Sequence, residues 1–412
     1  MIVFFIICAF IIYWAMIGYP LSLIILDKIL KKSKPDKNKK YCPTITVMVV
    51  AHNEEKVIVK KLENLISIDY PKEKYEIVVT SDFSTDKTNE LVKKFIKEHK
   101  DYKISLHETV SHKGKTNAQN EAQKKISSEI LVMTDANCYF KKDAVKEIVT
   151  CFSNPSVGYA CGLTIFTNNK ENRTADSEST YWNFDSKCRD IESRFQTITA
   201  GGGNLYACRT KDYKDIPLIE CHDSSFPILF ALDGYRAIFE PNAISYEKAG
   251  ESDKDEYKRK VRMNRNIFHN ILPSWKIINI FKYRWFTYFY LGHRTFRYLL
   301  WFAHIGLFIS NFVLALTSSY FWKVLMFLHV LVYLVSILVI RLKIKNKYLK
   351  MLSYYCLTIF AQINGVFNIL TGKSKPTWAK LRTLPRSKPM LNNLIDHQPK
   401  SPFTAGFLHD NC

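Results

Sequence analysis

The chain has 412 residues, and its 59 Lys and Arg against 38 Asp and Glu give a formal net charge of +21. Almost half of the residues are hydrophobic (47%), and many stand in uncharged runs that are too long for the surface of a soluble protein. A wholly soluble protein is therefore excluded. Nucleic acid is not expected as a partner, because the basic residues form no recognisable binding module. The ten cysteines include no C-x-x-C pair, which favours buried thiols over zinc ligands or disulfides.

The first uncharged run extends from Met1 to Leu26 and contains no Asp, Glu, Lys or Arg. It is long enough for one membrane-spanning helix. Lysines follow this run instead of preceding it, which is typical of a retained anchor and not of a cleaved signal peptide. Because basic residues mark the cytosolic side of a span, we predict a transmembrane helix over residues 1–26, a basic linker over 27–43 and a cytosolic domain over 44–270.

In the polar block that follows, predicted strands and helices alternate. The run TITVMVV, which begins at Thr44, is apolar and β-branched and ends at polar residues, as buried parallel strands do. Later strands are predicted at YEIVVTS, KISLHE and EILVMTD, with helices near residues 55–68, near residues 89–98 and from Lys115. The alternation predicts an α/β fold with a mostly parallel sheet, whose ligands gather at the carboxyl ends of the strands. Neither G-x-G-x-x-G nor G-x-x-x-x-G-K-[ST] occurs, so the nucleotide sites with those motifs are not expected.

Three further uncharged runs lie at 298–322, 324–340 and 351–372. We predict three transmembrane helices within 298–372, preceded by amphipathic interfacial helices at 271–297 and followed by a basic tail at 373–412. Basic residues flank the last run on both sides, so the charge rule places both of its ends in the cytosol. Four complete crossings do not satisfy this rule. Either the last run is re-entrant, or the rule fails at the tail.

Three pairs of polar residues follow apolar runs or turns of the polar block: Asp82 with Asp86, Asp135 with Asn137, and Glu220 with Asp223. Their oxygen atoms suit a divalent cation that holds a pyrophosphate, and a carboxylate among them could serve as the base for an acceptor hydroxyl. Lys115 and the arginines around Arg262 could neutralise a departing diphosphate. The pattern therefore favours transfer of a sugar from a nucleoside diphosphate. Asp86 is better interpreted as the cap of the next helix.

At these residues the chain resembles the family 2 glycosyltransferases with a GT-A fold. It resembles the membrane-integrated kind, which includes cellulose, chitin and hyaluronan synthases and bacterial capsule and exopolysaccharide enzymes. The segment AHNEE resembles A-Y-N-E-E, SDFSTDKT resembles D-D-G-S-T-D-G-T, and GKTNAQN resembles G-K-x-x-A-L-N. TDAN stands at the D-x-D position, AGGGNLYACR resembles the glycine-rich acceptor segment, and HDSSFPILFALDGYRAIFEP resembles the segment that leads into G-Y-R and E-P.

The resemblance implies a role for each matched residue. Asp82 would contact the nucleobase, Lys115 would bind the diphosphate, and Asp223 would be the catalytic base. Asp135 would face the donor sugar and, with Asn137, hold Mg²⁺ or Mn²⁺. The residues implied on the donor side are Ala51, His52, Glu54, Asp82, Lys115, Asp135 and Arg262. Those implied on the acceptor side are Gly202, Gly203 and Asn204.

The chain departs from the family pattern at two places. Asn137 replaces the second acid of D-x-D, and its neutral oxygen would bind a metal ion more weakly. The Q-x-x-R-W motif of processive synthases is absent, although Arg262 in EYKRKVRMNRN could replace its arginine. This absence favours the addition of one or a few sugars, or a polymerase of an outlying subgroup. His112, beside the diphosphate-binding segment, is interpreted as an exposed loop histidine.

The predicted function is that of a membrane-bound inverting glycosyltransferase, a hexosyltransferase of polysaccharide or cell-surface glycan synthesis. Inversion is implied by the resemblance. Its expected partners are a nucleotide-sugar donor, in particular a UDP-sugar, a glycan or lipid-linked acceptor, and membrane lipids. The protein is expected in the cell membrane as a multi-pass protein with its catalytic domain in the cytosol. The alternatives are a polyprenyl-phosphate glycosyltransferase and a non-enzymatic membrane component of glycan export.

Overall fold

The computed structural model describes residues 1–167, 185–248, 253–317, 319–342, 344 and 346–377. The chain divides into two compact units. The sheet unit comprises residues 34–167, 200–248 and 376–412, and the helical unit comprises residues 1–33, 168–199 and 249–375.

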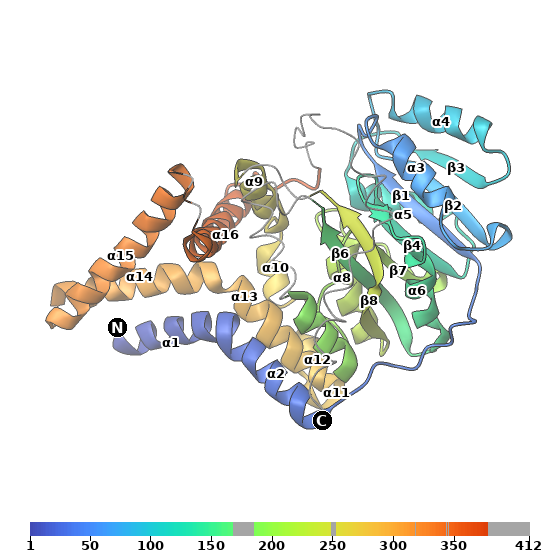
Figure 1. Ribbon diagram of the computed structural model, residues 1–412. Coiled ribbons are helices and arrows are strands. Elements are labelled where there is room, and N and C mark those ends of the chain that lie inside the picture. The colour runs from blue at the N-terminus through green and yellow to red at the C-terminus, as the bar shows by residue number, and fades with distance from the viewer. Residues whose placement is uncertain (168–184, 249–252, 318, 343, 345, 378–412) are drawn as a thin grey trace. The chain divides into compact units, whose positions relative to one another are not determined.

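The sheet unit begins as the sequence predicts, with alternating strands and helices (Figure 1). Its strands are β1 (Ile45–Ala51), β2 (Tyr75–Ser81), β3 (Lys103–Glu108), β4 (Ile130–Asp135), β5 (Tyr139–Phe140), β6 (Val157–Phe166), β7 (Tyr206–Arg209) and β8 (Arg236–Glu247). Its helices are α3 (Ile58–Ile66), α4 (Thr88–Glu98), α5 (Lys115–Gln123), α6 (Ala144–Thr150) and α8 (His222–Leu232). The strands predicted at residues 44–50, 75–81, 103–108 and 129–135 are thus confirmed as β1 to β4.

The described strands form one eight-stranded sheet in the order β3-β2-β1-β4-β7-β6-β8-β5. The pairings among β3, β2, β1 and β4 are parallel, as is that of β6 with β8. Strand β7 is antiparallel to both of its neighbours, and so is β5 to β8. The α/β class is confirmed, and the sheet is mixed: β3, β2, β1 and β4 form one parallel block, and β6 with β8 form a second parallel pair.

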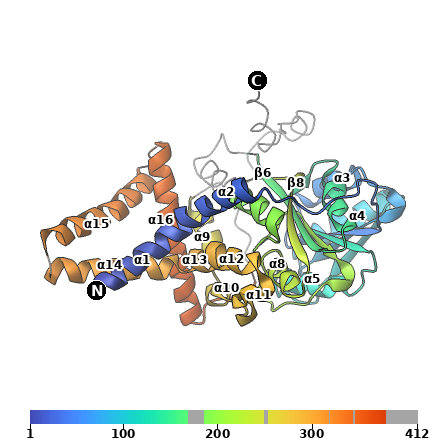
Figure 2. The same cartoon turned by 90° about the horizontal axis from the view of Figure 1, so that it is seen from below.

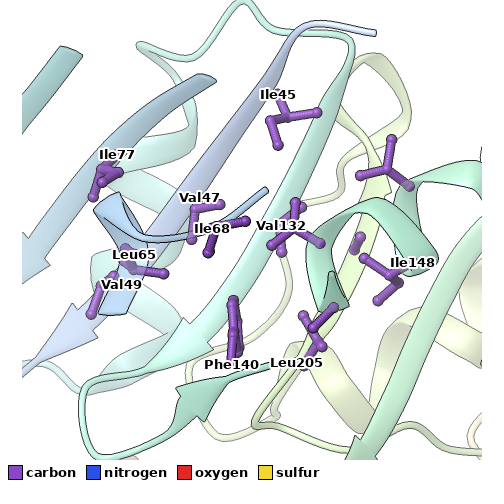
Figure 3. Close-up of a cluster of buried hydrophobic side chains, with 14 of the residues drawn as sticks. Ile45, Val47, Val49, Leu65, Ile68, Ile77, Val132, Phe140, Ile148 and Leu205 are labelled. Carbon is purple, nitrogen blue, oxygen red and sulfur yellow. The ribbon is translucent and has the colours of Figure 1, made fainter. Parts of the chain in front are cut away.

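Apolar side chains on one face of the parallel strands pack against α3, α4 and α6 and form a large core cluster of the sheet unit. Figure 3 shows Val47 and Val49 of β1, Val132 of β4, Leu65 of α3 and Ile148 of α6 within this cluster. All five are fully buried (0% exposed). Burial of one such side chain stabilises a fold by about 1.5–3 kcal/mol. The core therefore holds the ends of these strands, from which the candidate site is built, in fixed positions.

The described secondary-structure elements of the helical unit are all helices. They are α1 (Ile2–Tyr13), α2 (Tyr19–Leu30), residues 185–195, α9 (Asp253–Met263), α10 (Ile267–Ile271), α11 (Ile280–Tyr283), α12 (Trp285–Phe289), α13 (Phe296–Tyr298), α14 (Leu300–Thr317), α15 (Tyr320–Arg341) and α16 (Lys347–Leu370). One-turn helices, two of them π-helices at Trp14–Gly18 and Tyr290–Thr295, connect several of these. Helices α1 and α14 run side by side (Figures 1 and 2). A Cβ atom on Gly306 of α14 would lie 2.7 Å from the Cys8 sulfur, so a small residue permits this close approach.

Among the described residues, three helices are long and apolar enough to cross a membrane: Ile2–Leu30, Leu300–Thr317 and Tyr320–Arg341. They correspond to the predicted N-terminal span and to the first two predicted C-terminal spans. The third predicted C-terminal span, residues 351–372, lies largely in α16, which is not among these helices. Polar side chains such as Lys350, Gln362 and Asn364 lower its hydropathy. Two of the three predicted C-terminal spans thus correspond to helices that are long and apolar enough to cross a membrane.

Candidate active site

The first donor-side residues predicted from the sequence lie at one edge of the sheet, where three parallel strands end. Ala51 ends β1 and pairs with Ser81, the last residue of β2, which directly precedes Asp82. Asp135 ends β4 and pairs with Val50 of β1. Open α/β sheets bind their ligands outside the carboxyl ends of the strands. The fold therefore brings Ala51, Asp82 and Asp135 to the edge where a ligand is expected.

Asp82 is fully buried, and its carboxylate faces the loop that leads into α5. Oδ1 accepts a hydrogen bond from the Lys113 N–H at 3.1 Å, and Oδ2 accepts one from the Gly114 N–H at 2.9 Å. Gly114 has a φ of 101°, a conformation that side chains disfavour. The carboxylate therefore fixes the loop that presents Lys115. The nucleobase contact implied for Asp82 stays a prediction.

His52 and His112 form a stacked pair beside Asp82, with ring centroids 4.0 Å apart and an interplanar angle of 16°. His52 Nδ1 lies 2.7 Å from the backbone oxygen of Asp82, and His112 Nδ1 lies 2.8 Å from Asp82 Oδ2. One ligand atom from each of the three residues lies within 4.8 Å of the others, so together they could hold a metal ion. In the stacked arrangement they do not suit one, because the lone pair of an imidazole lies in its ring plane. The pair therefore packs as two stacked aromatic rings against the Asp82 carboxylate.

Lys115, Asp135 and Asp223 converge around Gly203. The Lys115 ammonium forms an ion pair with Asp135 Oδ1. A Cβ atom on Gly203 would lie 3.3 Å from Asp223 Oδ2 and 3.6 Å from Lys115 Nζ. Burial opposes the charge of Lys115, but its anionic neighbours, led by Asp135, outweigh that effect and raise the pKa of Lys115 above its usual range. The ammonium is therefore charged at neutral pH, as the binding of a diphosphate requires.

Asn137 and Asn204 both donate hydrogen bonds to Glu247, the last residue of β8. Asn137 Nδ2 lies 3.2 Å from Glu247 Oε1, and Asn204 Nδ2 lies 2.6 Å from Glu247 Oε2. The amide oxygen of Asn137 is then the atom that this side chain offers to a cation. The carboxylates of Asp135 and Glu247 and this amide oxygen are hard oxygen donors, the type that Mg²⁺ and Mn²⁺ prefer. By donor type these residues suit such an ion, while Asp135 is ion-paired with Lys115 and both Glu247 oxygens accept hydrogen bonds from amides.

Asp223 lies in the first turn of α8, next to a buried histidine. His222 Nδ1 lies 3.0 Å from Gln119 Oε1, and its Nε2 lies 2.7 Å from the Tyr213 hydroxyl. Burial, aided by the nearby Lys115 ammonium, lowers the pKa of His222 to about 3. His222 is therefore a neutral support at physiological pH, and Asp223 is the ionisable group that this turn directs toward Gly203.

The remaining predicted residues lie at loop positions or in the other unit. The Glu54 N–H donates to Thr88 Oγ1 at 2.8 Å, and Gly202 is partly exposed. Asp86 accepts a hydrogen bond from the Thr88 N–H at 3.0 Å, but the N-cap of α4 is Lys87 and the cap position makes no side-chain hydrogen bond, so the interpretation of Asp86 as the cap is corrected. Arg262 lies on α9, in the helical unit, so the donor role implied for it rests on the sequence alone.

Three residues of this region had no predicted role. His112 is partly buried in its stacked pair, whereas the sequence analysis interpreted it as exposed. Glu247 ends a β-strand with an acid, as Asp135 does, and that shared pattern could have identified it. Gly201 donates its N–H to the Asp223 backbone oxygen at 2.8 Å, and a Cβ atom there would lie 1.9 Å from the Tyr159 hydroxyl. No signal in the sequence distinguishes it from the two glycines that follow.

Comparison with known proteins shows that the chain is similar to glycosyltransferases. The model of the family described as "Glycosyl transferase family 2" matches residues 46–216, a region that contains Asp82, Lys115 and Asp135 but ends before Asp223. "Beta-monoglucosyldiacylglycerol synthase" from a Nostoc species is 32% identical over 130 residues, which are 32% of this chain and 28% of that protein. "Poly-beta-1,6-N-acetyl-D-glucosamine synthase" from Staphylococcus aureus is 34% identical over 131 residues, which are 31% of this chain and 30% of that protein. The chain thus spans less than a third of the length of these two relatives.

Two comparisons extend further along the chain. "Probable glycosyltransferase YdaM" from Bacillus subtilis is 26% identical over 303 residues, 69% of each protein. Among solved structures, the mannosyltransferase PcManGT from Pyrobaculum calidifontis, in complex with GDP-Man and Mn²⁺, matches with a TM-score of 0.70 at 22% identity. This match covers 90% of the present chain and 99% of that chain, and it shows that the two folds are alike.

Proposed function

Because residues 46–216 form a glycosyltransferase family 2 domain with a GT-A fold, we propose that the chain is a membrane-bound inverting glycosyltransferase. Its reaction is the transfer of a hexosyl group from a nucleotide sugar to an acceptor hydroxyl. The observation that carries this proposal is the convergence of Lys115, Asp135 and Asp223 around Gly203. The Lys115 ammonium, which can bind the leaving group, and the Asp223 carboxylate, which can act as base for the acceptor, therefore lie close together.

In the proposed mechanism, Asp223 accepts the proton of the acceptor hydroxyl. The acceptor oxygen attacks the anomeric carbon from the face opposite the nucleotide, and the bond from that carbon to the diphosphate oxygen breaks. Lys115 binds the departing nucleoside diphosphate through its ammonium group. Asp135, Asn137 and Glu247 would hold Mg²⁺ or Mn²⁺, which supplies further positive charge for the diphosphate.

Several features support the proposed substrates and location. We expect a UDP-sugar as donor, with its base on the surface formed by His52 and His112. The acceptor is a glycan, in polysaccharide or cell-surface glycan synthesis; one relative is named for making a glycolipid and another for making a polysaccharide. The three apolar helices support a place in the cell membrane, and the lysines after the first of them support a cytosolic sheet unit.

The test is donor turnover by the purified protein in detergent or lipid. We would measure nucleoside diphosphate release from a panel of nucleotide sugars, with Mg²⁺ or Mn²⁺ and with a chelator. One donor should be turned over, and chelation should stop that turnover. Asp135→Ala and Asp223→Asn should lower it by roughly 10²–10⁴-fold. The control is Asp233→Asn, at the exposed far end of α8, which should keep the parent rate.

The same variants address the alternatives. The name of the glycolipid-synthesising relative keeps a lipid acceptor open, and a polyprenyl phosphate would need little base catalysis because it is already charged. Asp223→Asn should then retain transfer to the lipid phosphate while losing transfer to a sugar hydroxyl. Release of no nucleoside diphosphate from any donor, even with a membrane extract as acceptor source, would contradict the enzyme proposal and favour a component of glycan export.

A further inference from the structure

Helix α3 carries a lysine on its buried face. Ile58, Lys61, Leu62 and Leu65 follow helical spacing and are all buried. Lys61 is fully buried (0% exposed), and in the described part of the chain its ammonium has no carboxylate partner. Burial lowers the pKa of Lys61 to about 8. The Asp135 charge acts on Lys61 without forming an ion pair with it, and burial still dominates; since a buried ammonium without an ion pair destabilises a fold, stability alone does not account for this side chain.

The ammonium of Lys61 contacts both sides of the turn that carries Asp135 and Asn137. Nζ donates to Thr134 Oγ1 at 3.0 Å, immediately before Asp135, and to the Cys138 backbone oxygen at 2.5 Å, immediately after Asn137. These hydrogen bonds join the two ends of the turn through one charged group. A charged donor forms stronger hydrogen bonds than a neutral one. The position of the two candidate cation ligands therefore depends on Lys61.

Asn64, one turn further along α3, binds the backbone of Phe140, which follows the turn of Asp135 and Asn137. Asn64 Nδ2 donates to the Phe140 backbone oxygen at 2.9 Å, and the Phe140 N–H donates to Asn64 Oδ1 at 2.7 Å. The Phe140 ring centroid lies 4.0 Å from the Lys61 ammonium. These contacts close the side of the turn that faces α3 and keep Lys61 in place.

Thr134 connects Lys61 to Asn204, a residue of the glycine-rich segment on the predicted acceptor side. Its hydroxyl accepts from Lys61 and donates to the Asn204 backbone oxygen at 2.7 Å. The Asn204 side chain donates to Glu247, which also accepts from Asn137. A continuous chain of hydrogen bonds thus leads from Lys61 to both segments that border the site.

We propose that Lys61 is a positioning residue, which holds the turn of Asp135 and Asn137 and links it through Thr134 to the acceptor segment at Asn204. This inference rests on the proposed function, because that turn is its candidate cation site. Groups that orient metal ligands typically change metal affinity or activity by roughly 10–100-fold when they are removed. Lys61 touches neither the ligand atoms nor the substrate, so its effect is exerted through the turn.

The test compares Lys61→Met with the parent, using the donor that the parent turns over. Methionine fills a similar volume and removes the three N–H donors and the buried charge. We expect roughly a 10–100-fold loss of kcat at saturating donor and a similar rise in the Mn²⁺ concentration for half-activation. The melting temperature should be unchanged or higher, because the cost of burying an ammonium that forms no ion pair is removed. Lys60→Met is the matched control, since Lys60 is the exposed neighbour on the same helix, and it should match the parent in all three measurements.

A second pair of variants tests the link through Thr134. Thr134→Val removes the hydroxyl and should reproduce the kinetic loss, whereas Thr134→Ser keeps it and should restore activity. The double variant Lys61→Met/Thr134→Val should lose little more than the worse single variant, because both act on one chain of contacts. Parent values of kcat and Mn²⁺ half-activation in Lys61→Met would overturn the inference, as would a lower melting temperature with unchanged kinetics. Absence of turnover in the parent itself would instead contradict the proposed function.

Discussion

His222 and Asp223 are neighbours in sequence, but the structure gives them different electrostatic surroundings. His222 lies in the protein interior, where Gln119 and Tyr213 satisfy its ring nitrogens, while the Asp223 carboxylate lies within reach of the Lys115 ammonium. Burial favours the neutral form of the His222 imidazole and lowers its pKa. One turn of α8 therefore supplies both a rigid support and a candidate base.

The low pKa of His222 predicts a loss of stability in acid. Its pKa is about 3 in the folded protein and about 6.5 in the unfolded chain, so the unfolded chain binds more protons between these values. Stability should therefore decrease as the pH falls from about 6.5 toward 3, by about 2–3 kcal/mol on reaching about pH 4.5. The measurement is the melting temperature of the purified protein across this range. His222→Gln should show a shallower acid decline, and an identical decline in both proteins would contradict the assignment.

At the scale of elements, the glycine-rich segment 201–203 packs against the protein interior at one end and borders the candidate site at the other. Gly201 contacts the Asp223 backbone and has no room for a side chain beside Tyr159. Gly203 borders the space between Asp223 and Lys115. Two glycines that look equivalent in the sequence therefore have different neighbours, one in the packed interior and one at the candidate site.

This difference predicts distinct outcomes for two alanine substitutions. Gly201→Ala should destabilise the fold by about 1–3 kcal/mol, because the added methyl overlaps the Tyr159 hydroxyl. Gly203→Ala should change stability by less than about 0.5 kcal/mol, because its nearest neighbours are the ends of side chains. It should nevertheless lower turnover, since the methyl occupies space beside Asp223 Oδ2. The measurements are the melting temperature and the donor turnover of each variant, compared with those of the parent. Equal effects on stability would contradict the distinction.

At the scale of the molecule, three apolar helices make a simpler membrane topology than the four predicted runs. If only those three cross, the chain after α15 returns to the side of the sheet unit, and both basic segments that flank α16 lie in the cytosol. The conflict with the charge rule then disappears. Pro376, near the start of the tail, belongs to the sheet unit and lies beside the loop that leads into α5: a Cβ atom on Gly114 would lie 2.9 Å from the Pro376 oxygen.

We therefore predict that the end of the chain is cytosolic. A C-terminal reporter that is active only in the cytosol should be active in intact cells, and the same reporter inserted after α14, near residue 318, should be inactive. Opposite activities would show that α16 crosses the membrane. The control is a reporter in the basic linker at residues 34–40, which the topology places in the cytosol.

The sequence by itself determined the features that depend on neighbouring residues. The apolar runs predicted β1 to β4 and the apolar helices, and the order of motifs predicted the fold and identified Lys115, Asp135 and Asp223, which the structure brings together. Such features can be predicted because strand, helix and turn preferences act over a few residues.

Only the tertiary structure decided the rest. The mixed sheet depends on which strands pair, and the stacking of His112 on His52, the place of Glu247 beside Asn137 and the contacts of Lys61 depend on segments far apart in the chain. Lys61 shows the reason most clearly. By itself it is one more lysine on a helix of a strongly basic chain, and its position under the turn of Asp135 and Asn137 follows from the packing of α3 on the sheet.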